Sequence, residues 1–277
     1  MTSQINTILL IGATSGIGEA ILRRFHNLGK TIIATGRNRG KLESLAAELP
    51  GIETRVLDIS DLASLPTNLS KILEDFPSLD TVFVTAGIQK SFSLFDPSDI
   101  ETKSDTIVQE ITTNLTAPSL LIQLLSPHLL QRAKSGKKAT IFITSSSIGY
   151  IPLGFYPTYC ATKSGVQALV KSFRQQLSFQ GPEAIRNINI VEVIPPYVDT
   201  GLDKEHRAHI EAMQGGEGKG FPAMPLKEFI DQLFESLDQL APDGSIKKEI
   251  GVGFGDVAIR AWRGSFDAIY EQMGLSV

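Results

Sequence analysis

Short apolar runs alternate with longer amphipathic segments along most of this chain, and this alternation restricts the fold more than any other feature. Six runs consist almost entirely of β-branched or aliphatic residues, as expected for strands that are covered on both faces. A regular succession of strand and helix predicts a parallel sheet with helices on both sides. The expected strands are residues 7–11, 31–35, 54–57, 81–85, 139–144 and 189–194, and the expected helices are 16–28, 39–49, 62–76, 105–133 and 158–179.

The C-terminal part continues this pattern with an expected helix at 226–240, a short strand at 249–253 and a helix at 256–273. No internal repeat, low-complexity tract or linker rich in Pro, Gly or Ser divides the sequence. With 277 residues, of which 42% are hydrophobic, the chain has enough apolar material for one large core. We therefore expect a doubly wound α/β fold that forms a single domain over residues 1–277.

One stretch, residues 195–222, interrupts the alternation. It begins with Pro195-Pro196 and contains the sequence GGEGKG at 215–220. Glycine at this density loses much conformational entropy on ordering, which is typical of a mobile segment. Because loops beyond the carboxyl ends of strands bind ligands in α/β sheets, we expect a substrate lid at about 195–225. An inert surface loop is the alternative.

Charge and cysteine content argue against several classes of protein. The chain has 26 basic and 30 acidic residues, a net charge of -4 and no long run of either sign, so we expect no nucleic-acid partner. Cys160 is the only cysteine, which rules out an intramolecular disulfide. No apolar stretch reaches 18 residues and no signal-like segment opens the chain, so we expect no membrane span and a cytoplasmic location.

A glycine-rich turn lies between the first expected strand and the first expected helix, with the sequence GATSGIG at 12–18. Strand, turn and helix start form the context of a nucleotide-binding loop. Free backbone N–H groups and the positive end of the helix attract a pyrophosphate, although an ordinary turn is the alternative. The residues expected to contact a cofactor here are Gly12, Thr14, Ser15, Gly16, Ile17 and Gly18.

The end of the second expected strand bears on which dinucleotide would bind. NAD-binding units usually place an acidic residue there, but this chain has no acid between Thr31 and Lys41. An arginine can pair with a 2′-phosphate, whereas a carboxylate would repel it. We therefore expect Arg37 to make that contact, with Asn38 beside it, and NADP(H) to be preferred over NAD(H). A solvated arginine at a helix start is the alternative.

Two further strand ends supply candidate cofactor contacts. Asp58 and Ile59 follow the third expected strand, where an adenine could lie, although Asp58 would look no different as a helix cap. Ala86 and Gly87 follow the fourth expected strand, and their small size leaves space for a ribose. Packing alone could also explain these two small residues.

Tyr159 and Lys163 are four residues apart within an expected helix, so both project from the same face. The positive charge of the lysine favours the phenolate, and we expect it to lower the pKa of Tyr159 from near 10 towards neutrality. A phenol of that kind is a general acid or base. Together with a dinucleotide loop it points to hydride chemistry, with a chance surface pair as the alternative.

A set of residues that runs from the glycine turn through Asn114 and Ser146 to Tyr159 and Lys163 stands out along the chain. In order and spacing, this set resembles the short-chain dehydrogenase/reductase family. The match covers roughly residues 5–200, and the last 75 residues match only in outline. The resemblance implies a Rossmann-type fold, a nicotinamide cofactor and a Ser-Tyr-Lys-Asn catalytic group. The matching residues are the glycine turn, Ala86, Gly87, Asn114, Ser146, Tyr159 and Lys163.

The resemblance also implies a role for each catalytic residue. Tyr159 would donate a proton to a carbonyl oxygen in reduction, or accept one in oxidation, and Ser146 would hydrogen-bond the same oxygen. Lys163 would bind the nicotinamide ribose while tuning Tyr159, and Asn114 would support a water-linked proton path behind Lys163. These roles agree with the chemistry, because two donors aimed at the oxygen stabilise the negative charge that a hydride leaves there.

Neighbouring residues compete for two of these roles. The spacing to Tyr159 selects Ser146 from three consecutive serines, with Ser145 as the alternative. Tyr156 is the rival phenol, but a cysteine and not a lysine stands four residues after it. We expect that cysteine, Cys160, to be a packed residue and not a nucleophile. We also expect no metal site. His206 and His209, with Glu205 and Glu211 nearby, are more simply explained as a solvated polar face.

The chain departs from the family pattern at three places. Ile11 replaces the usual threonine, and Val84-Thr85 replaces an asparagine pair, so we expect one side-chain link between the central strands to be lost. Pro195-Pro196 replaces proline-glycine. The expected cofactor contacts on this nicotinamide side are Pro195, Val198 and Thr200.

These observations lead to one expected function and two alternatives. We expect an NADPH-dependent enzyme that interconverts a carbonyl and an alcohol on a small, hydrophobic substrate. A cofactor-using isomerase or epimerase without net redox change, and a non-enzymatic NADP(H)-binding scaffold or sensor, are the alternatives. The residues expected at the pocket rim are Ile148, Tyr150, Leu153, Phe155, Tyr156, Tyr197, Phe221 and Met224.

Two features of this hypothesis remain open. Lys90 or Arg207 could hold a charged substrate, which would overturn the hydrophobic assignment. By family resemblance, the helices at 105–133 and 158–179 would form a subunit interface. We therefore expect a homodimer or homotetramer.

Overall fold

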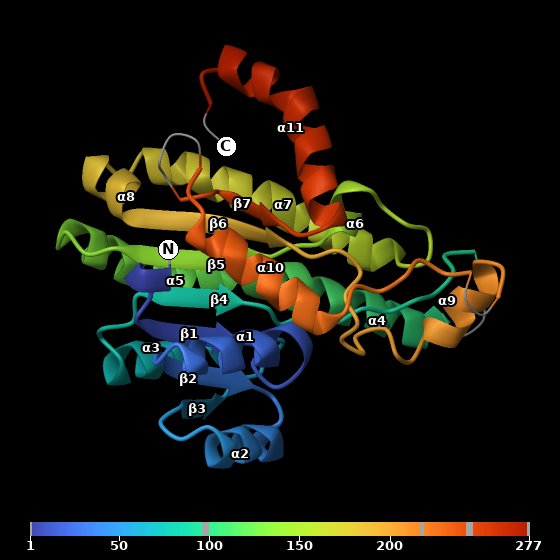
Figure 1. The fold of residues 1–277 in the computed structure, drawn as a ribbon, viewed down its shortest axis with the longest axis horizontal. Helices are drawn as coiled ribbons and strands as arrows, with labels where there is room; N and C mark the ends of the chain where they lie inside the picture. Colours follow the sequence, from blue (N-terminus) through green and yellow to red (C-terminus); the bar gives the residue numbers. More distant parts are fainter. Residues whose placement is uncertain (1, 96–99, 217–218, 242–245, 276–277) are drawn as a thin grey trace.

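A computed structural model describes residues 2–95, 100–216, 219–241 and 246–275 of the chain. Its named strands form one seven-stranded sheet, and every neighbouring pair of strands is parallel. Along the sheet the order is β3-β2-β1-β4-β5-β6-β7 (Figure 1). The strands are β1 (Thr7–Ile11), β2 (Thr31–Gly36), β3 (Glu53–Val56), β4 (Thr81–Val84), β5 (Ala139–Thr144), β6 (Ile188–Ile194) and β7 (Glu249–Gly251).

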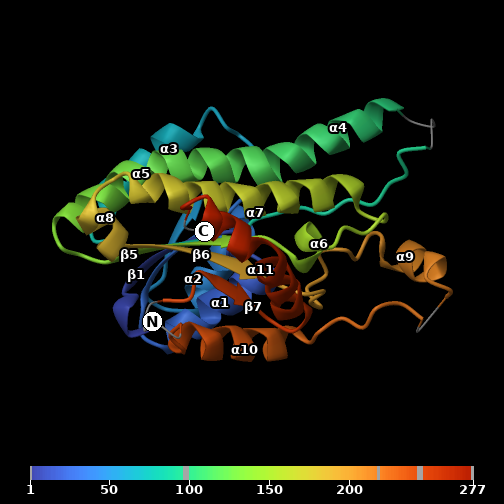
Figure 2. The same ribbon diagram turned by 90° about the horizontal axis from the view of Figure 1, so that it is seen from above.

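Helices cover both faces of this sheet, so the expected doubly wound α/β fold is confirmed (Figure 2). One face carries α3 (Leu65–Asp75), α4 (Ile100–Ile111), α5 (Ala117–Lys134), α7 (Pro157–Ser178) and α8 (Pro182–Asn187). The other face carries α1 (Gly16–Asn27), α2 (Arg39–Glu48) and α10 (Leu226–Asp238). The remaining helical segments are η1 (Thr2–Gln4), η2 (Thr112–Thr116), α6 (Ser147–Tyr150), α9 (Arg207–Met213) and α11 (Phe254–Gln272).

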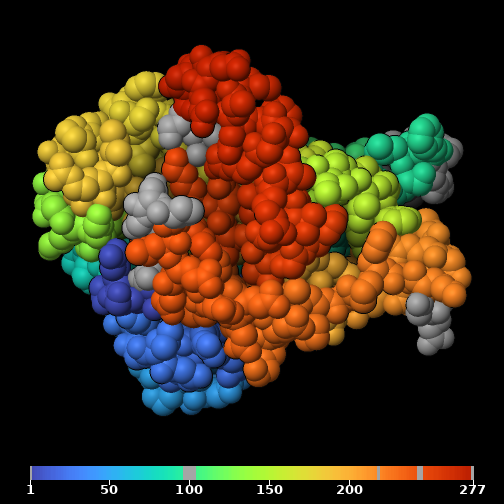
Figure 3. Space-filling view, turned by 45° about the horizontal axis from the view of Figure 1, so that its top comes forward, coloured from blue at the N-terminus to red at the C-terminus, as the bar shows by residue number. Residues whose placement is uncertain are grey.

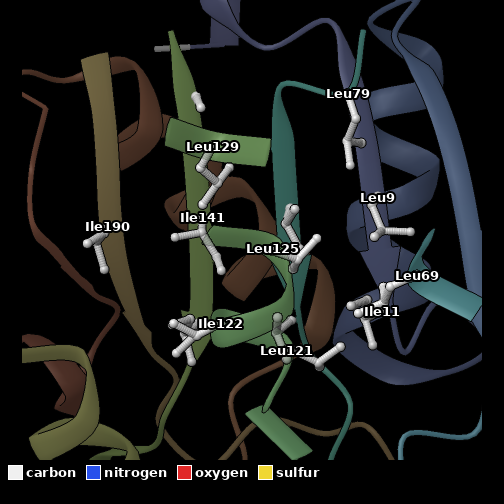
Figure 4. Close-up of a cluster of buried hydrophobic side chains, with 14 of the residues drawn as sticks. Leu9, Ile11, Leu69, Leu79, Leu121, Ile122, Leu125, Leu129, Ile141 and Ile190 are labelled. Atoms are coloured by element: carbon white, nitrogen blue, oxygen red, sulfur yellow. The ribbon is translucent and has the colours of Figure 1, made fainter. Parts of the chain in front are cut away.

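The two hydrophobic cores follow from the alternation of side chains along each strand. Leu9 and Ile11 of β1 belong to the core beneath α3 and α5, which Figure 4 shows in close-up. Ile8 and Leu10 of the same strand face α1 and α10 on the other side. Because both faces are covered, all five residues of β1 are buried. Each fully buried aliphatic side chain of this kind stabilises the fold by roughly 1.5–3 kcal/mol.

The order in which the chain adds strands to the sheet changes direction at β1. From β1 the chain adds β2 and β3 on one side, and then β4 to β7 on the other. Ile11 at the end of β1 pairs in register with Thr35 on one side and with Val84 on the other. The carboxyl ends of the central strands therefore lie together at one edge of the sheet. In open α/β sheets the crevice beyond such a reversal point is where ligands bind.

The prediction of one continuous helix over residues 105–133 is wrong. The structure has α4, then a π-helical turn over Thr112–Thr116, and then α5. Pro118 contributes to this interruption, because it has no N–H to donate to the carbonyl group four residues earlier. Such π-turns are frequent at functional sites. Several other boundaries differ by a few residues; for example, α3 begins at Leu65 and β7 ends at Gly251.

Two segments project from the end of the molecule at which the strands terminate. Figures 1 and 2 show α9 at this end together with the start of α4, and Figure 3 shows both extending from the main body. The expected lid contains α9, but its residues 217–218 lie outside the described part of the chain. Within the described residues, none of the helices has the length and apolar character that crossing a bilayer needs.

Candidate active site

A cavity of about 1370 Å³ opens beyond the carboxyl ends of the central strands. The glycine-rich turn lines one end, and the segment around α9 lines the other. Two residues expected at the site, Asn38 and Asn114, are not part of the wall. The expected residues that do line it are Gly12, Thr14, Ser15, Gly16, Ile17, Gly18, Arg37, Asp58, Ile59, Ala86, Gly87, Ser146, Tyr159, Lys163, Pro195, Val198 and Thr200.

The glycine-rich turn is packed so tightly that side chains would not fit. Gly12 has φ +97°, and a Cβ on it would lie 2.6 Å from the main-chain nitrogen of Ala86. A Cβ on Gly18 would lie 2.0 Å from the carbonyl oxygen of Gly12. The main chain itself therefore forms the floor of the cavity at the start of α1. This arrangement fits the pyrophosphate of a dinucleotide, which needs backbone N–H groups and a positive helix end.

Hydrogen bonds between neighbouring strand ends hold this turn in place. The N–H groups of Gly12 and Ala13 donate to the carbonyl oxygen of Thr35 at 3.1 and 2.8 Å. The hydroxyl of Thr85 donates to the carbonyl oxygen of Ile11 at 3.0 Å. The expectation that Val84-Thr85 loses the side-chain link between the central strands is therefore wrong. A threonine hydroxyl reaches the neighbouring main chain directly and replaces the amide.

Arg37 is exposed on the cavity wall just after β2, and it forms no ion pair within the described residues. Asn38 is engaged elsewhere, because its amide oxygen caps α2 by accepting a hydrogen bond of 3.0 Å from Lys41 N–H. Asp58 lines the wall, and its carboxylate accepts hydrogen bonds from the N–H and hydroxyl of Ser60 at 2.9 and 2.7 Å. Asp58 therefore orders a turn and is not the cap of α3.

Ser146, Tyr159 and Lys163 come together at the middle of the cavity. Ser146 precedes α6 at the end of β5, and Tyr159 and Lys163 project from one face of α7. The Ser146 hydroxyl lies beside the Tyr159 phenol on the cavity wall, where it favours the phenolate and lowers the pKa of Tyr159. The Lys163 ammonium donates a hydrogen bond of 2.9 Å to the carbonyl oxygen of Thr144 and lies 5.5 Å from the ring centroid of Tyr159.

The pKa of Tyr159 differs from the expectation. Burial raises this pKa above the ordinary value, and the neighbouring hydroxyl of Ser146 opposes the rise. Cys160 and Glu110, when they are ionised, raise the pKa of Tyr159 further. Lys163 does not bring it towards neutrality here, because its ammonium is turned to Thr144 and is itself buried. Burial lowers the pKa of Lys163 to about 8.

The neighbouring serine and a nearby tyrosine form a separate buried network. Ser145 donates a hydrogen bond of 2.6 Å to Glu192, and Tyr150 donates to the same carboxylate at 3.0 Å. Lys171 completes this network at 3.5 Å from Glu192. Ser145 is thus occupied, which leaves Ser146 as the serine beside Tyr159. Tyr150 points away from the cavity wall, so the expectation that it lies at the pocket rim is wrong.

Asn114 lies in the π-helical turn, with a side chain that is 1% exposed. Its amide accepts a hydrogen bond of 2.9 Å from the N–H of Ile88 and donates one of 2.8 Å to the carbonyl oxygen of the same residue. A second donation reaches Thr162 at 3.3 Å. The side chain of Asn114 therefore fixes the segment after β4 against α7.

Apolar side chains form most of the expected rim of the cavity, and the two cations considered as partners of a charged substrate, Arg207 and Lys90, are paired. Seven of the eight expected rim residues line it. Arg207 forms ion pairs of 3.0 Å with Asp199 and with Asp203, and Lys90 pairs with Glu205 at 2.9 Å. The two cations that could have held a charged substrate are thus neutralised. The rim residues are Ile148, Leu153, Phe155, Tyr156, Tyr197, Phe221 and Met224.

Sequence reasoning missed two charged residues near this cavity. Asp203 is buried and accepts a hydrogen bond of 2.6 Å from the Tyr197 hydroxyl, and its four-residue spacing to Arg207 could have predicted their ion pair. Glu110 is buried behind the wall, and the apolar residues beside it in α4 gave no signal of a polar role. Within the described residues, no group of acidic, histidine or cysteine side chains could hold a metal ion.

A glycine-rich turn and a buried phenol–ammonium pair on one cavity fit an oxidoreductase that uses a nicotinamide dinucleotide. The comparison with protein families agrees, because a model described as short chain dehydrogenase matches residues 6–211. The chain therefore belongs to the short-chain dehydrogenase family and is an NAD(P)-dependent oxidoreductase. It is similar to the uncharacterized oxidoreductase DltE of Bacillus subtilis (strain 168), with 29% identity over 268 residues that cover 97% of this chain and 96% of that protein.

Solved structures share the fold. A short chain dehydrogenase from Burkholderia cenocepacia J2315 in complex with NADP superposes with a TM-score of 0.71 at 15% identity and covers 98% of each chain. A 3-ketoacyl-(acyl-carrier-protein) reductase from Brucella melitensis, complexed with NADH, has a TM-score of 0.68 at 21% identity. That match covers 89% of this chain and 96% of the reductase.

Proposed function

We propose that this chain is an NADPH-dependent reductase that interconverts a carbonyl and an alcohol on a small, hydrophobic substrate. The observation that carries this proposal is that Ser146 and Tyr159 lie together on the wall of the cavity that begins at the glycine-rich turn. Two hydroxyl groups side by side can both donate to one carbonyl oxygen. The reacting carbon would then lie between these donors and the cofactor end of the cavity.

The raised pKa of Tyr159 suits the reductive direction. A phenol that stays protonated near neutral pH is ready to donate its proton to the substrate oxygen. A bound reduced nicotinamide would supply the hydride. Ser146 would donate a second hydrogen bond to the oxygen while negative charge develops on it. Lys163, held by Thr144, would place a positive charge behind the phenol and stabilise it as the proton leaves.

Arg37 supports the preference for NADP(H). Its guanidinium is exposed on the cavity wall and is available to a 2′-phosphate, and no carboxylate follows β2 at that position to hold a ribose diol. Relatives with this fold are found with NADP and with NADH, so the fold alone does not select the cofactor. The preference therefore depends on Arg37. Asn38 could add only its amide NH₂ group, because its oxygen caps α2.

The apolar outer end of the cavity favours an uncharged ketone or aldehyde. Arg207 and Lys90 are both paired with carboxylates, so neither of these two cations is a free partner for a carboxylate substrate. We infer that α9 and its neighbouring residues act as the lid, because Lys90 of the segment after β4 reaches across to Glu205 beside α9. A homodimer or homotetramer built on the α4–α5 and α7 surfaces, a single catalytic domain and a cytoplasmic location remain predictions.

Steady consumption of NADPH tests this function. The purified chain should oxidise NADPH with at least one member of a panel of cyclic and aromatic ketones, and more slowly with keto acids of similar size. Substrate turnover without net NADPH oxidation would instead indicate an isomerase or epimerase. Tight NADPH binding with no turnover of any panel member would indicate a sensor and contradict the proposal.

A further inference from the structure

Glu192 is a carboxylate buried within strand β6, and its side chain is 0% exposed. A buried charge is costly unless it is paired and hydrogen-bonded. Oε1 of Glu192 accepts hydrogen bonds of 2.6 Å from the hydroxyl of Ser145 and 3.0 Å from that of Tyr150, and Oε2 lies 3.5 Å from the ammonium of Lys171. Side chains from the segment after β5, from α6 and from α7 therefore meet at this one carboxylate.

Two partners of Glu192 lie on either side of the active-site serine along the chain. Ser145 immediately precedes Ser146, and Tyr150 is the last residue of α6, the one-turn helix that Ser146 caps. A helix of four residues has little stability of its own, so contacts with the rest of the fold decide where it lies. Glu192 thus holds both ends of the segment from which Ser146 reaches the cavity wall.

The backbone of this segment explains why the two serines have different surroundings. Ser146 is extended, with φ −167° and ψ 153°, and successive side chains of an extended chain point to opposite sides. Because Ser145 is turned to Glu192, Ser146 is turned to the cavity. The N–H of Ser145 also donates a hydrogen bond of 2.9 Å to the carbonyl oxygen of Val193, the residue that follows Glu192 in β6.

Lys171 connects this arrangement to the helix of the reacting phenol. Lys171 and Tyr159 both belong to α7, so the ion pair between Lys171 and Glu192 joins the element that carries the phenol to the segment that carries the serine. A buried ion pair is weak support for stability, because apolar side chains of similar volume often serve a fold as well. Glu192, Tyr150 and Lys171 are not part of the cavity wall, so any effect of theirs on the reaction passes through residues that are.

From these contacts we propose that Glu192 is a positioning residue of the active site, which holds the hydroxyl of Ser146 beside Tyr159 so that both can donate to one carbonyl oxygen. The inference rests on the proposed reductase function. Ser145 and Tyr150 transmit the position of the carboxylate to the serine, and Lys171 anchors the carboxylate from α7. Glu192 itself contacts neither substrate nor cofactor.

Backbone hydrogen exchange tests this positioning without any turnover. In Glu192→Gln the amide group cannot accept at both positions, and its NH₂ group would face the ammonium of Lys171. The hydrogen-bonded N–H groups within residues 145–149 should therefore exchange about tenfold faster or more, measured relative to those of β5, which report global unfolding. Tyr150→Phe keeps the ring and the ion pair but removes one hydroxyl, and it should show a smaller increase. This second variant decides the question if Glu192→Gln does not fold.

Glu249→Gln is the matched control for hydrogen exchange. Glu249 is a buried carboxylate of the neighbouring strand β7 and is paired with Arg174 of α7, but it makes no contact with the serine segment. This control should leave the relative exchange rate of residues 145–149 unchanged. A relative rate that is also unchanged in Glu192→Gln and Tyr150→Phe, or one that Glu249→Gln raises equally, would overturn the proposal.

A double-mutant cycle with NADPH tests the consequence for the reaction. Glu192→Gln should lower kcat by about 10- to 100-fold and leave the KM for NADPH unchanged, because the serine is displaced while the cofactor contacts are intact. In a Ser146→Ala chain the same substitution should cost less than about twofold, since the group that it positions is gone. Tyr150→Phe should follow the same pattern with smaller losses, and Glu249→Gln should retain the wild-type kcat.

Two outcomes of this cycle would refute the proposal. Glu192→Gln could retain the wild-type kcat, or its loss could multiply in full with that of Ser146→Ala, which would show that Glu192 does not act through the serine. A wild-type chain that consumes no NADPH would instead overturn the proposed function. Hydrogen exchange would then still decide whether Glu192 holds the serine segment in place.

Discussion

The Lys163 ammonium donates a hydrogen bond of 2.9 Å to the main-chain carbonyl oxygen of Thr144. Thr144 is the last residue of β5, so the end of a central strand fixes a charge of α7 behind the phenol of Tyr159. This position is unfavourable for a cation, because burial lowers the pKa of Lys163 to about 8. The site therefore holds a charge that costs stability, as is common for groups kept for function.

Replacing this lysine should stabilise the folded chain while it abolishes activity. The pKa of Lys163 is about 8 in the folded chain, whereas an ordinary lysine has a pKa of 10.5, so the unfolded chain binds more protons between these values. The penalty is complete below about pH 8 and disappears as pH rises towards 10.5. In denaturant unfolding, Lys163→Met should raise the free energy of unfolding at pH 7 by roughly 1–3 kcal/mol, with little gain near pH 10.5. A variant that is less stable than wild type at pH 7 would show that the Thr144 contact outweighs the burial penalty.

A methyl group in the glycine-rich turn should weaken cofactor binding. In Gly18→Ala the new Cβ would meet the carbonyl oxygen of Gly12 at 2.0 Å, so the turn must shift. We expect a loss of about 1–3 kcal/mol in stability and an NADPH dissociation constant at least about tenfold higher, measured by fluorescence titration. The matched control is Gly264→Ala, where a Cβ meets nothing within 4 Å on the exposed face of α11. The control should be stabilised by about 0.5–1 kcal/mol, and equal NADPH binding by Gly18→Ala would contradict the assignment of the turn.

The charge at the end of β2 should decide between the two dinucleotides. Arg37→Glu replaces a partner of the 2′-phosphate with a group that repels it and can hold a ribose diol. We expect kcat/KM with NADPH to fall about 10- to 100-fold and kcat/KM with NADH to hold or rise. Arg39→Glu, an exposed residue of α2 that does not line the cavity, makes the same charge change as a control. If both variants lose the same amount, the effect is one of net charge and not of a contact with Arg37.

The sheet and the reacting side chains were predictable from sequence because their signals are local. Runs such as 7–11 are buried on both faces and contain only strand-favouring residues, and the four-residue spacing of Tyr159 and Lys163 places them on one helix face. The glycine-rich turn was equally predictable, since its residues are constrained by the adjoining strand and helix. The π-helical turn has only a partial signal in the sequence, because Pro118 has no N–H to continue a regular helix.

What sequence reasoning could not supply depends on contacts between distant segments. The pKa of Tyr159 rises because α7 is packed over the sheet, and no spacing along the chain conveys that burial. Thr85 links the central strands through the carbonyl oxygen of Ile11, a contact across 74 positions. Glu110 likewise acquires its raised pKa from the burial and charges that the folded site provides.

The most direct test of the account is single-turnover reduction by Tyr159→Phe in the presence of NADPH. The phenyl ring keeps the shape of the buried side chain but removes its proton, so NADPH binding should be unchanged while the rate of carbonyl reduction falls by about 10²–10⁴-fold. Ser146→Ala should give a smaller loss, since one donor to the oxygen would remain. A Tyr159→Phe chain that binds NADPH normally and reduces the same ketone at the wild-type rate would contradict the central claim that this phenol donates the proton.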